Sequence, residues 1–207
     1  MLIWRKFLID KMNEAAMKTS IRILAILLVA CVLQTEHALA QEETEAVPNP
    51  SRLSAGISAG HYKYDPGIAI EFTTRAIFQN HLSLRIRGSV QWLEAYQAIH
   101  YQWISYQTFS TGLVYNGRLF DRTRFFAEFG ILGIVPDARF SDKTFVEGFY
   151  EFNGLEITLL TRKDYTLCLY LGVGPAFIKA SAEKIEGNPR YGNGLHFING
   201  FRVYFGK

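Results

Sequence analysis

Apolar and polar residues alternate along most of the chain from residue 51 to residue 207. The clearest stretch runs from Leu82 to Trp92. One of its faces carries only apolar or aromatic side chains apart from a glycine, and the other carries serine, arginine and glutamine. A period of two is the signature of a β-strand, because successive side chains of a strand point to opposite faces. We count eight such stretches, and they predict an all-β domain.

The expected strands are separated by connections of unequal length. They cover about 53–62, 68–78, 82–92, 105–116, 124–134, a stretch that ends with 154–159, 167–174 and 195–205. The connections after the second, fourth and sixth strands are short. Those after the third, fifth and seventh, at 94–103, 135–143 and 179–193, are longer. Short turns at one end and long loops at the other are typical of outer-membrane barrels, and an even strand count places both termini in the periplasm.

The polar face of these strands carries charges that need an explanation. In a membrane barrel this face lines the lumen, whereas the apolar face meets lipid. We therefore predict an eight-stranded antiparallel transmembrane up-and-down β-barrel over 51–207. Eight strands leave just enough room for side chains, so the interior charges are interpreted as a structural plug of paired residues rather than a catalytic site. The predicted interior network comprises Glu71, Arg75, Arg85, Arg87, Glu128, Glu156 and Arg202.

An export segment precedes this domain. Lys18 and Arg22 are followed by an apolar run over 23–33, which is too short to span a bilayer, and then by Ala38-Leu39-Ala40. A basic start, an apolar middle and a small-x-small end form a secretory signal, with cleavage expected after Ala40.

Two details of the N-terminal segment stay open. Met17 resembles a natural start, which would make 1–16 an extension of the signal. The run Leu28-Val29-Ala30-Cys31 resembles a bacterial lipobox, in which Cys31 would be lipidated and become the new N-terminus. Residues 41–50 are acidic, contain two prolines and lack periodicity, and they are expected to be a flexible periplasmic lead-in.

Charge and composition exclude several function classes. Removing the five basic and three acidic residues of 1–40 leaves 17 basic against 16 acidic residues, and no basic run suits a nucleic acid. Cys168 is then the single cysteine, inside an apolar strand, where a small buried residue is the expected role. The histidines lack metal-ligand spacing, and we find no phosphate-binding loop or nucleophile elbow. No catalytic residue, metal or cofactor is predicted.

The end of the chain resembles a known assembly signal. Gly200-Phe201-Arg202-Val203-Tyr204-Phe205 is similar to the C-terminal signal of the small outer-membrane β-barrel family that includes OmpA- and OmpX-like barrels. Gly200, Val203 and Phe205 match its pattern, while Ile198 and the two residues after Phe205 depart from it. The resemblance implies outer-membrane lipid and the assembly machinery as partners and the bacterial outer membrane as location. Family members serve as structural or adhesion proteins and occasionally as enzymes, so fold alone does not settle function.

Three functions follow from these observations. We expect a non-enzymatic outer-membrane barrel with a structural or surface-interaction role through its long loops and an extracellular partner of unknown identity. A lipid-A-modifying enzyme is a second hypothesis, because His81-Leu82-Ser83 and Glu94 resemble the spacing of such enzymes. A soluble, secreted lipocalin-like carrier is a third, and it requires the reverse arrangement, with apolar residues inside and polar residues outside.

Overall fold

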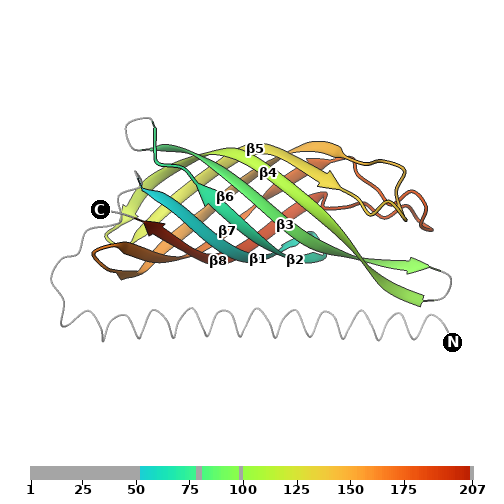
Figure 1. Ribbon diagram of the computed structural model, residues 1–207, viewed down its shortest axis with the longest axis horizontal. Coiled ribbons are helices and arrows are strands. Elements are labelled where there is room, and N and C mark those ends of the chain that lie inside the picture. Colours follow the sequence, from blue (N-terminus) through green and yellow to red (C-terminus); the bar gives the residue numbers. More distant parts are fainter. Residues whose placement is uncertain (1–51, 78–80, 98–99, 206–207) are drawn as a thin grey trace. The chain divides into compact units, whose positions relative to one another are not determined.

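The chain forms a closed antiparallel barrel in which each strand pairs with its neighbours in sequence (Figure 1). The computed structural model describes residues 52–77, 81–97 and 100–205. The eight strands are β1 (Leu53–Tyr62), β2 (Asp65–Thr73), β3 (Leu82–Gln97), β4 (His100–Phe120), β5 (Thr123–Val135), β6 (Val146–Thr161), β7 (Tyr165–Ile178) and β8 (Gly194–Phe205). No helix among the described residues is long and apolar enough to cross a membrane.

The first and last strands close the barrel. β1 pairs with β8 from Leu53 opposite Phe205 to Tyr62 opposite His196. Closure gives every strand two neighbours over most of its length, so almost no edge is left unpaired around the wall. A spanning structure needs this, since lipid offers no partner for backbone polar groups. The predicted fold class is confirmed.

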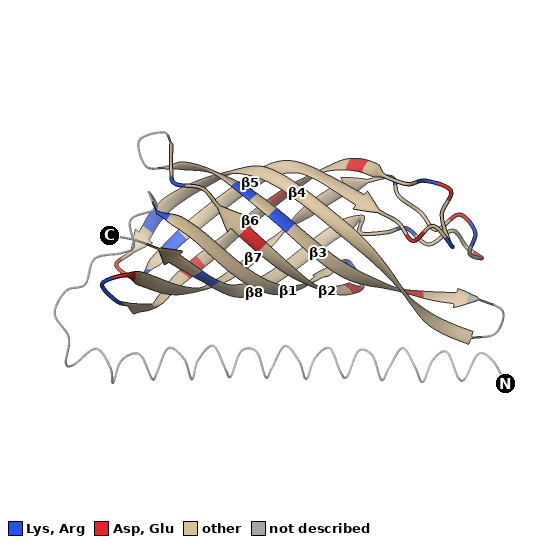
Figure 2. Cartoon of the chain, in the orientation of Figure 1, with Lys and Arg blue, Asp and Glu red and all other residues tan. Residues whose placement is uncertain are grey.

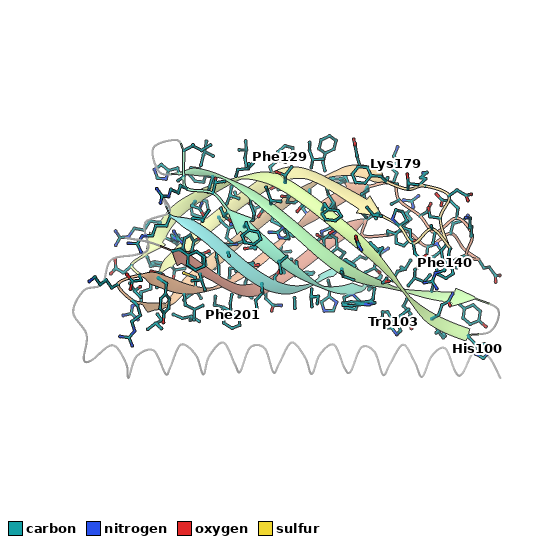
Figure 3. The ribbon with its side chains drawn as sticks, viewed as in Figure 1. His100, Trp103, Phe129, Phe140, Lys179 and Phe201 are labelled. Atoms are coloured by element: carbon teal, nitrogen blue, oxygen red, sulfur yellow. The ribbon has the colours of Figure 1, made fainter. Side chains whose placement is uncertain are left out.

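The outer face of the wall is apolar. Figure 3 shows Phe129 and Phe201 pointing outward from the wall, and both rings are about half exposed or more. The same face carries a wide set of exposed apolar side chains: Leu53, Ile57, Ile68, Ile70, Phe72, Leu84, Ile86, Val90, Phe109, Leu113, Ile131, Phe149, Leu155, Val173 and Phe205. The buried side chains of the inner face include arginine, glutamate, serine and threonine. This arrangement is opposite to that of the soluble carrier, so the lipocalin-like hypothesis is wrong.

β2 begins and ends earlier than the alternation predicted. Asp65, Pro66 and Gly67, which the alternation left outside the strand expected at 68–78, are the first residues of β2. Beyond Thr73 the pairing becomes irregular: the Thr74 amide donates to Leu84 O at 2.8 Å, and the Ile77 amide donates to Leu82 O at 2.6 Å.

This irregularity corrects the prediction for Arg75. Between those two hydrogen bonds, three steps along one chain segment oppose two along the other, which is a β-bulge. A bulge breaks the alternation of faces. Arg75 is therefore exposed and lies outside the interior network.

Residues 94–103, predicted to be a loop, are mostly strand. β3 continues to Gln97 and β4 starts at His100, with Glu94 opposite Trp103. The pairing of β2 with β3 stops at Gln91, and that of β4 with β5 stops at Gln107. Trp92–Gln97 and His100–Tyr106 therefore form a two-stranded ribbon that extends beyond the closed wall, where Figure 3 places His100 and Trp103 (Figures 1 and 3).

Four other connections follow the predicted asymmetry, whereas 63–64 at the end of the ribbon is short and 74–81 at the opposite end is longer than predicted. Residues 121–122 and 162–164 are tight turns at one end, whereas 136–145 and 179–193 are long segments at the end of the ribbon (Figure 1). The predicted signal peptide, the Cys31 lipidation site and the lead-in over 41–50 lie outside the described residues.

An arginine on the outer face tests whether that face meets lipid. Ile86 lies on β3 between Phe72 and Thr111 of the adjacent strands and is 55% exposed. We expect Ile86→Arg to lower the free energy of unfolding in phospholipid vesicles by about 2–4 kcal/mol. Tyr101→Arg, on the ribbon beyond the wall, is the matched control and should change it by less than about 1 kcal/mol. Equal effects in a denaturant titration would contradict a lipid-facing wall.

Candidate functional site

Several strands of the wall carry charged residues, which Figure 2 shows as blue and red segments among the tan ones. Glu71 of β2 is buried and pairs with two arginines. Glu71 Oε2 accepts hydrogen bonds from Arg87 Nε at 3.2 Å and from Arg87 Nη2 at 3.1 Å. Its Oε1 accepts from Arg202 Nε at 2.8 Å and from Arg202 Nη2 at 2.5 Å. One carboxylate therefore joins β3 to β8, the last strand of the barrel.

Glu128 of β5 extends this group on one side. Its Oε2 accepts from Arg85 Nη1 at 2.5 Å and from Arg87 Nη2 at 3.2 Å. Its Oε1 accepts from the hydroxyl of Tyr150 at 2.7 Å. Both arginines come from β3, two residues apart on the inner face, so the alternation of one strand supplies both cations.

Glu156 of β6 extends the group on the other side. It accepts hydrogen bonds from Arg202 Nη1 and Arg124 Nη2, and from the Tyr204 hydroxyl at 3.0 and 2.9 Å. The charges form one chain of alternating sign, which we call the interior ion chain: Arg85, Glu128, Arg87, Glu71, Arg202, Glu156 and Arg124.

The structure brings together all of the predicted interior residues except Arg75, and it adds Arg124. Arg124 stands four residues before Glu128 on the same predicted strand, so alternation puts both on the inner face. The pairing of Arg124 with Glu156 depends on the strand register, which places the two residues directly opposite each other on β5 and β6.

Alternation of sign makes these buried charges tolerable. Their side chains are at most 4% exposed, and isolated charges there would each cost several kcal/mol. Each carboxylate instead contacts two guanidinium groups. The arginines also lie over aromatic rings, Arg202 at 4.3 Å from Tyr170 and Arg124 at 4.7 Å from Tyr204, which adds cation–π attraction.

The side chains of the interior change from charged to apolar toward the end of the barrel where 136–145 and 179–193 lie. Above the ion chain, Ser89 and Thr108 share a hydrogen bond of 2.5 Å, and Gln91 donates to Ser89. Apolar and aromatic side chains follow, all buried: Tyr62, Leu93, Ile104, Tyr106, Leu132, Ile134, Ile178, Ile185 and Tyr191. Within this layer the Tyr106 hydroxyl donates to Asp65 at 2.7 Å.

The two long segments contact each other at this end. The Ser141 hydroxyl donates to Glu183 at 2.7 Å, and Lys184 pairs with Asp142 at 2.8 Å. The Lys184 amide also donates to Phe140 O at 3.1 Å. The Ser141 hydrogen bond lowers the pKa of Glu183, which keeps this carboxylate ionised at neutral pH. Burial raises the pKa of the Tyr191 hydroxyl, in the second of these segments, to about 12, so this hydroxyl stays protonated.

The candidate residues of a lipid-modifying enzyme are not brought together. His81 lies in the turn before β3, where its Nδ1 is 3.1 Å from Asn116 O. Ser83 is buried on the inner face and accepts a hydrogen bond from Asn116 Nδ2 at 3.3 Å. Glu94 is exposed and lies on the ribbon at the other end of β3. A serine, its base and its orienting carboxylate must lie within hydrogen-bond reach, and here they do not.

Other reactive groups among the described residues give no site either. No cluster of histidine, cysteine and carboxylate side chains in this part of the chain could hold a metal ion. Cys168 is buried with its Sγ 3.8 Å from the Thr158 hydroxyl, as expected for a small packing residue.

The residues of the predicted assembly signal lie on β8 beside β1 and β7. Phe205 is exposed on the outer face, Val203 is partly exposed, and Gly200 is buried in the wall opposite Ser58 and Tyr170. A Cβ at Gly200 would meet Ile57 O at 2.2 Å, so glycine is required there for packing. Recognition of this segment by the assembly machinery remains a prediction.

The molecule is a closed barrel of eight antiparallel strands. No family model matches the chain, and no curated protein matches it. The chain is similar to the N-terminal β-barrel domain of OprF from Pseudomonas aeruginosa, with 8% identity and a TM-score of 0.48 over 77% of this chain and 98% of that one. It is also similar to the outer membrane protein Ail from Yersinia pestis in a nanodisc, with 10% identity and a TM-score of 0.43 over 75% and 99%. Neisserial surface protein A is a third, with 12% identity and a TM-score of 0.42 over 74% and 94%.

Removing one carboxylate from the ion chain should cost much more than removing an exposed one. Glu156→Gln keeps the shape of the side chain but removes the buried negative charge that Arg124 and Arg202 both contact, while the pairing of Arg202 with Glu71 stays in place. We expect a loss of about 3–5 kcal/mol in the free energy of unfolding, measured by denaturant titration in vesicles. Asp121→Asn removes the exposed partner of Arg118 and should leave stability unchanged. A loss for Glu156→Gln no larger than for Asp121→Asn would show that the ion chain is not structural.

Proposed function

We propose that this protein is a non-enzymatic barrel of the bacterial outer membrane, with a plugged interior, that presents the β3–β4 ribbon and its neighbouring segments for contacts at the cell surface. The observation that carries this proposal is the separation of faces: apolar residues cover the outside of a closed wall, and the ion chain fills the inside. The predicted secretory signal and the terminal segment over 200–205 agree with this location.

The interior contacts support a plugged barrel. The ion chain joins side chains from β2, β3, β5, β6 and β8 across the lumen. Above it, the aromatic layer and the contacts between 136–145 and 179–193 fill the other end. An eight-stranded barrel has room for its own side chains and little more. A role in conducting solutes is therefore disfavoured.

The ribbon supports a role in surface contacts. Tyr96, Tyr101 and Trp103 are exposed on one face, and the rings of Tyr96 and Tyr101 lie 5.1 Å apart. No described strand pairs with the outer edges of the ribbon at Trp92–Gln97 or His100–Tyr106. A free edge offers backbone hydrogen bonds to an extended segment, and aromatic side chains offer anchoring area. The ribbon therefore suits the addition of a partner strand.

Cysteine labelling tests the location and orientation. We expect His100→Cys to react with a membrane-impermeant maleimide in intact cells, because the ribbon faces outward. Asp164→Cys, in the turn at the opposite end, should react only after the outer membrane is permeabilised. The parent chain serves as the blank, since Cys168 is buried. Labelling of both variants in intact cells would contradict the orientation.

Peptide binding tests the role of the ribbon. We expect the purified barrel in nanodiscs to bind members of an array of extended synthetic peptides. Tyr101→Ser/Trp103→Ser should weaken this binding at least tenfold by removing the aromatic anchors. Tyr64→Ser is the matched control, because Tyr64 is 80% exposed at the same end but lies outside the ribbon. An array on which no peptide is retained, or an equal loss in both variants, would argue against strand addition.

A further inference from the structure

The outward face of the β3–β4 ribbon carries one carboxylate among aromatic side chains. Trp92, Glu94 and Tyr96 of β3 share this face, because each is separated from the next by a buried residue. Glu94 lies directly opposite Trp103 of β4. Glu94, Tyr96 and Trp103 are exposed, and Trp92 is partly exposed. The carboxylate therefore has aromatic neighbours along its own strand and on the strand beside it.

The ribbon supplies no cation for this carboxylate. Glu94 is the only aspartate, glutamate, lysine or arginine in the sequence 92–106. No ion pair among the described residues includes Glu94, whereas Asp137 and Glu183 at the same end of the barrel each have a basic partner. The charge of Glu94 is therefore available to a cation that another molecule brings.

The edge of β3 beside Glu94 is open to a partner strand. Pairing of β2 with β3 ends at Gly67 opposite Gln91, and the preceding residue of β2 is Pro66, which cannot donate a backbone hydrogen bond. From Trp92 onward, no described strand pairs with this edge of β3. An incoming strand can therefore bind to the backbone groups of β3 along this stretch.

A strand added to this edge places one of its side chains directly opposite Glu94. Directly opposed residues have Cβ atoms about 4.5–5.5 Å apart, and diagonal neighbours are about 7–8 Å apart, within reach of long side chains. The side chain opposite Glu94 therefore also reaches the rings of Trp92 and Tyr96. A cation at that position is attracted by the carboxylate and by the aromatic faces at the same time.

Arginine suits these surroundings better than other cations. Its planar guanidinium can bind both oxygens of a carboxylate and can also stack on aromatic rings, which an ammonium group does less well. The ammonium headgroup of a lipid fits less well still, because it brings no backbone groups for the open edge of β3. A peptide segment with an arginine meets both the edge and the carboxylate.

We propose that the ribbon binds an extended protein segment that carries an arginine. The segment lies along the edge of β3 at Trp92–Gln97, with its guanidinium opposite Glu94 and between Trp92 and Tyr96. This inference rests on the strand addition proposed above and specifies the charge of the partner. A segment with a carboxylate at the same position is disfavoured, because like charges directly opposite each other destabilise paired strands.

A peptide array with one variable position tests the charge preference. Each extended synthetic peptide is made with arginine, citrulline or glutamate at its centre, and dissociation constants are measured by fluorescence anisotropy with the barrel in phosphatidylcholine nanodiscs. Citrulline has the shape of arginine without its charge. We expect the arginine form of a retained peptide to bind about fivefold more tightly than the citrulline form, and the glutamate form to bind most weakly.

Substitutions assign this preference to Glu94. Glu94→Gln removes the charge, keeps the shape of the side chain and should reduce the preference for arginine over citrulline to less than about twofold. Glu186→Gln is the matched control, because Glu186 is an exposed carboxylate of 179–193 outside the ribbon, and it should keep the full preference. Glu94→Arg should reverse the preference, so that the glutamate form binds most tightly.

The outcomes separate the arginine contact from the strand addition on which it rests. Equal binding of the arginine and citrulline forms, or a preference that Glu94→Gln leaves unchanged, would overturn the arginine contact and leave strand addition in place. A preference found in phosphatidylglycerol nanodiscs but absent in phosphatidylcholine nanodiscs would assign it to the lipid and would also overturn the contact. An array on which no peptide is retained in any form would overturn both proposals.

Discussion

The wall can close around seven charged side chains because their signs alternate. Every carboxylate of the interior ion chain contacts two guanidinium groups, and the two end positions are arginines, which are held over aromatic rings. The same low-polarity interior that makes an unpaired charge costly strengthens each correct pair. The charges also fix the identity of neighbouring positions. Gly56 illustrates this, because a Cβ there would lie 3.0 Å from Glu71 Oε1 and 2.8 Å from Phe201 O. The outer face has no comparable constraint, since any apolar side chain of suitable size can meet an acyl chain.

Most of the fold could be predicted from the sequence, because a strand has a fixed side-chain period and its two faces here have opposite polarity. That reasoning placed Glu71, Arg85, Arg87, Glu128, Glu156 and Arg202 on the inner face, where the structure has them. It was wrong for Arg75, since a bulge breaks the period and no residue in 74–77 marks it. It also ended β3 too early and started β4 too late, because the strands were expected to have the length of a membrane span while the pairing continues into the ribbon. Alternation does not predict which side chains contact each other. The pairing of Arg124 with Glu156 depends on the strand register, and the contacts between 136–145 and 179–193 follow no periodic pattern.

The two ends of the barrel differ in their connections and in the side chains that fill them. At the end with tight turns, connections as short as 121–122 hold neighbouring strands together with little exposed backbone. At the other end, an apolar layer, two long segments in mutual contact and the ribbon replace the ion chain. Polar groups that touch water need no internal partner, so sequence there is free to serve contacts with other molecules. Glu151 and Asn153 are an exception on the outer face, because both are exposed polar residues of β6, and neither was singled out from the sequence.

The ion chain also constrains the order in which the barrel matures. Glu71 and Arg202 are separated by 131 residues, and they belong to the second and the last strand. Until β8 docks, Arg202 is not yet in place. Glu71 then contacts only Arg87 of the ion chain, and Glu156 contacts only Arg124. Both carboxylates then require hydration, so water stays in the unfinished lumen. The lumen therefore loses its water when β8 docks, late in folding. Until Arg202 is in place, a nascent barrel would remain hydrated and open between β1 and β8.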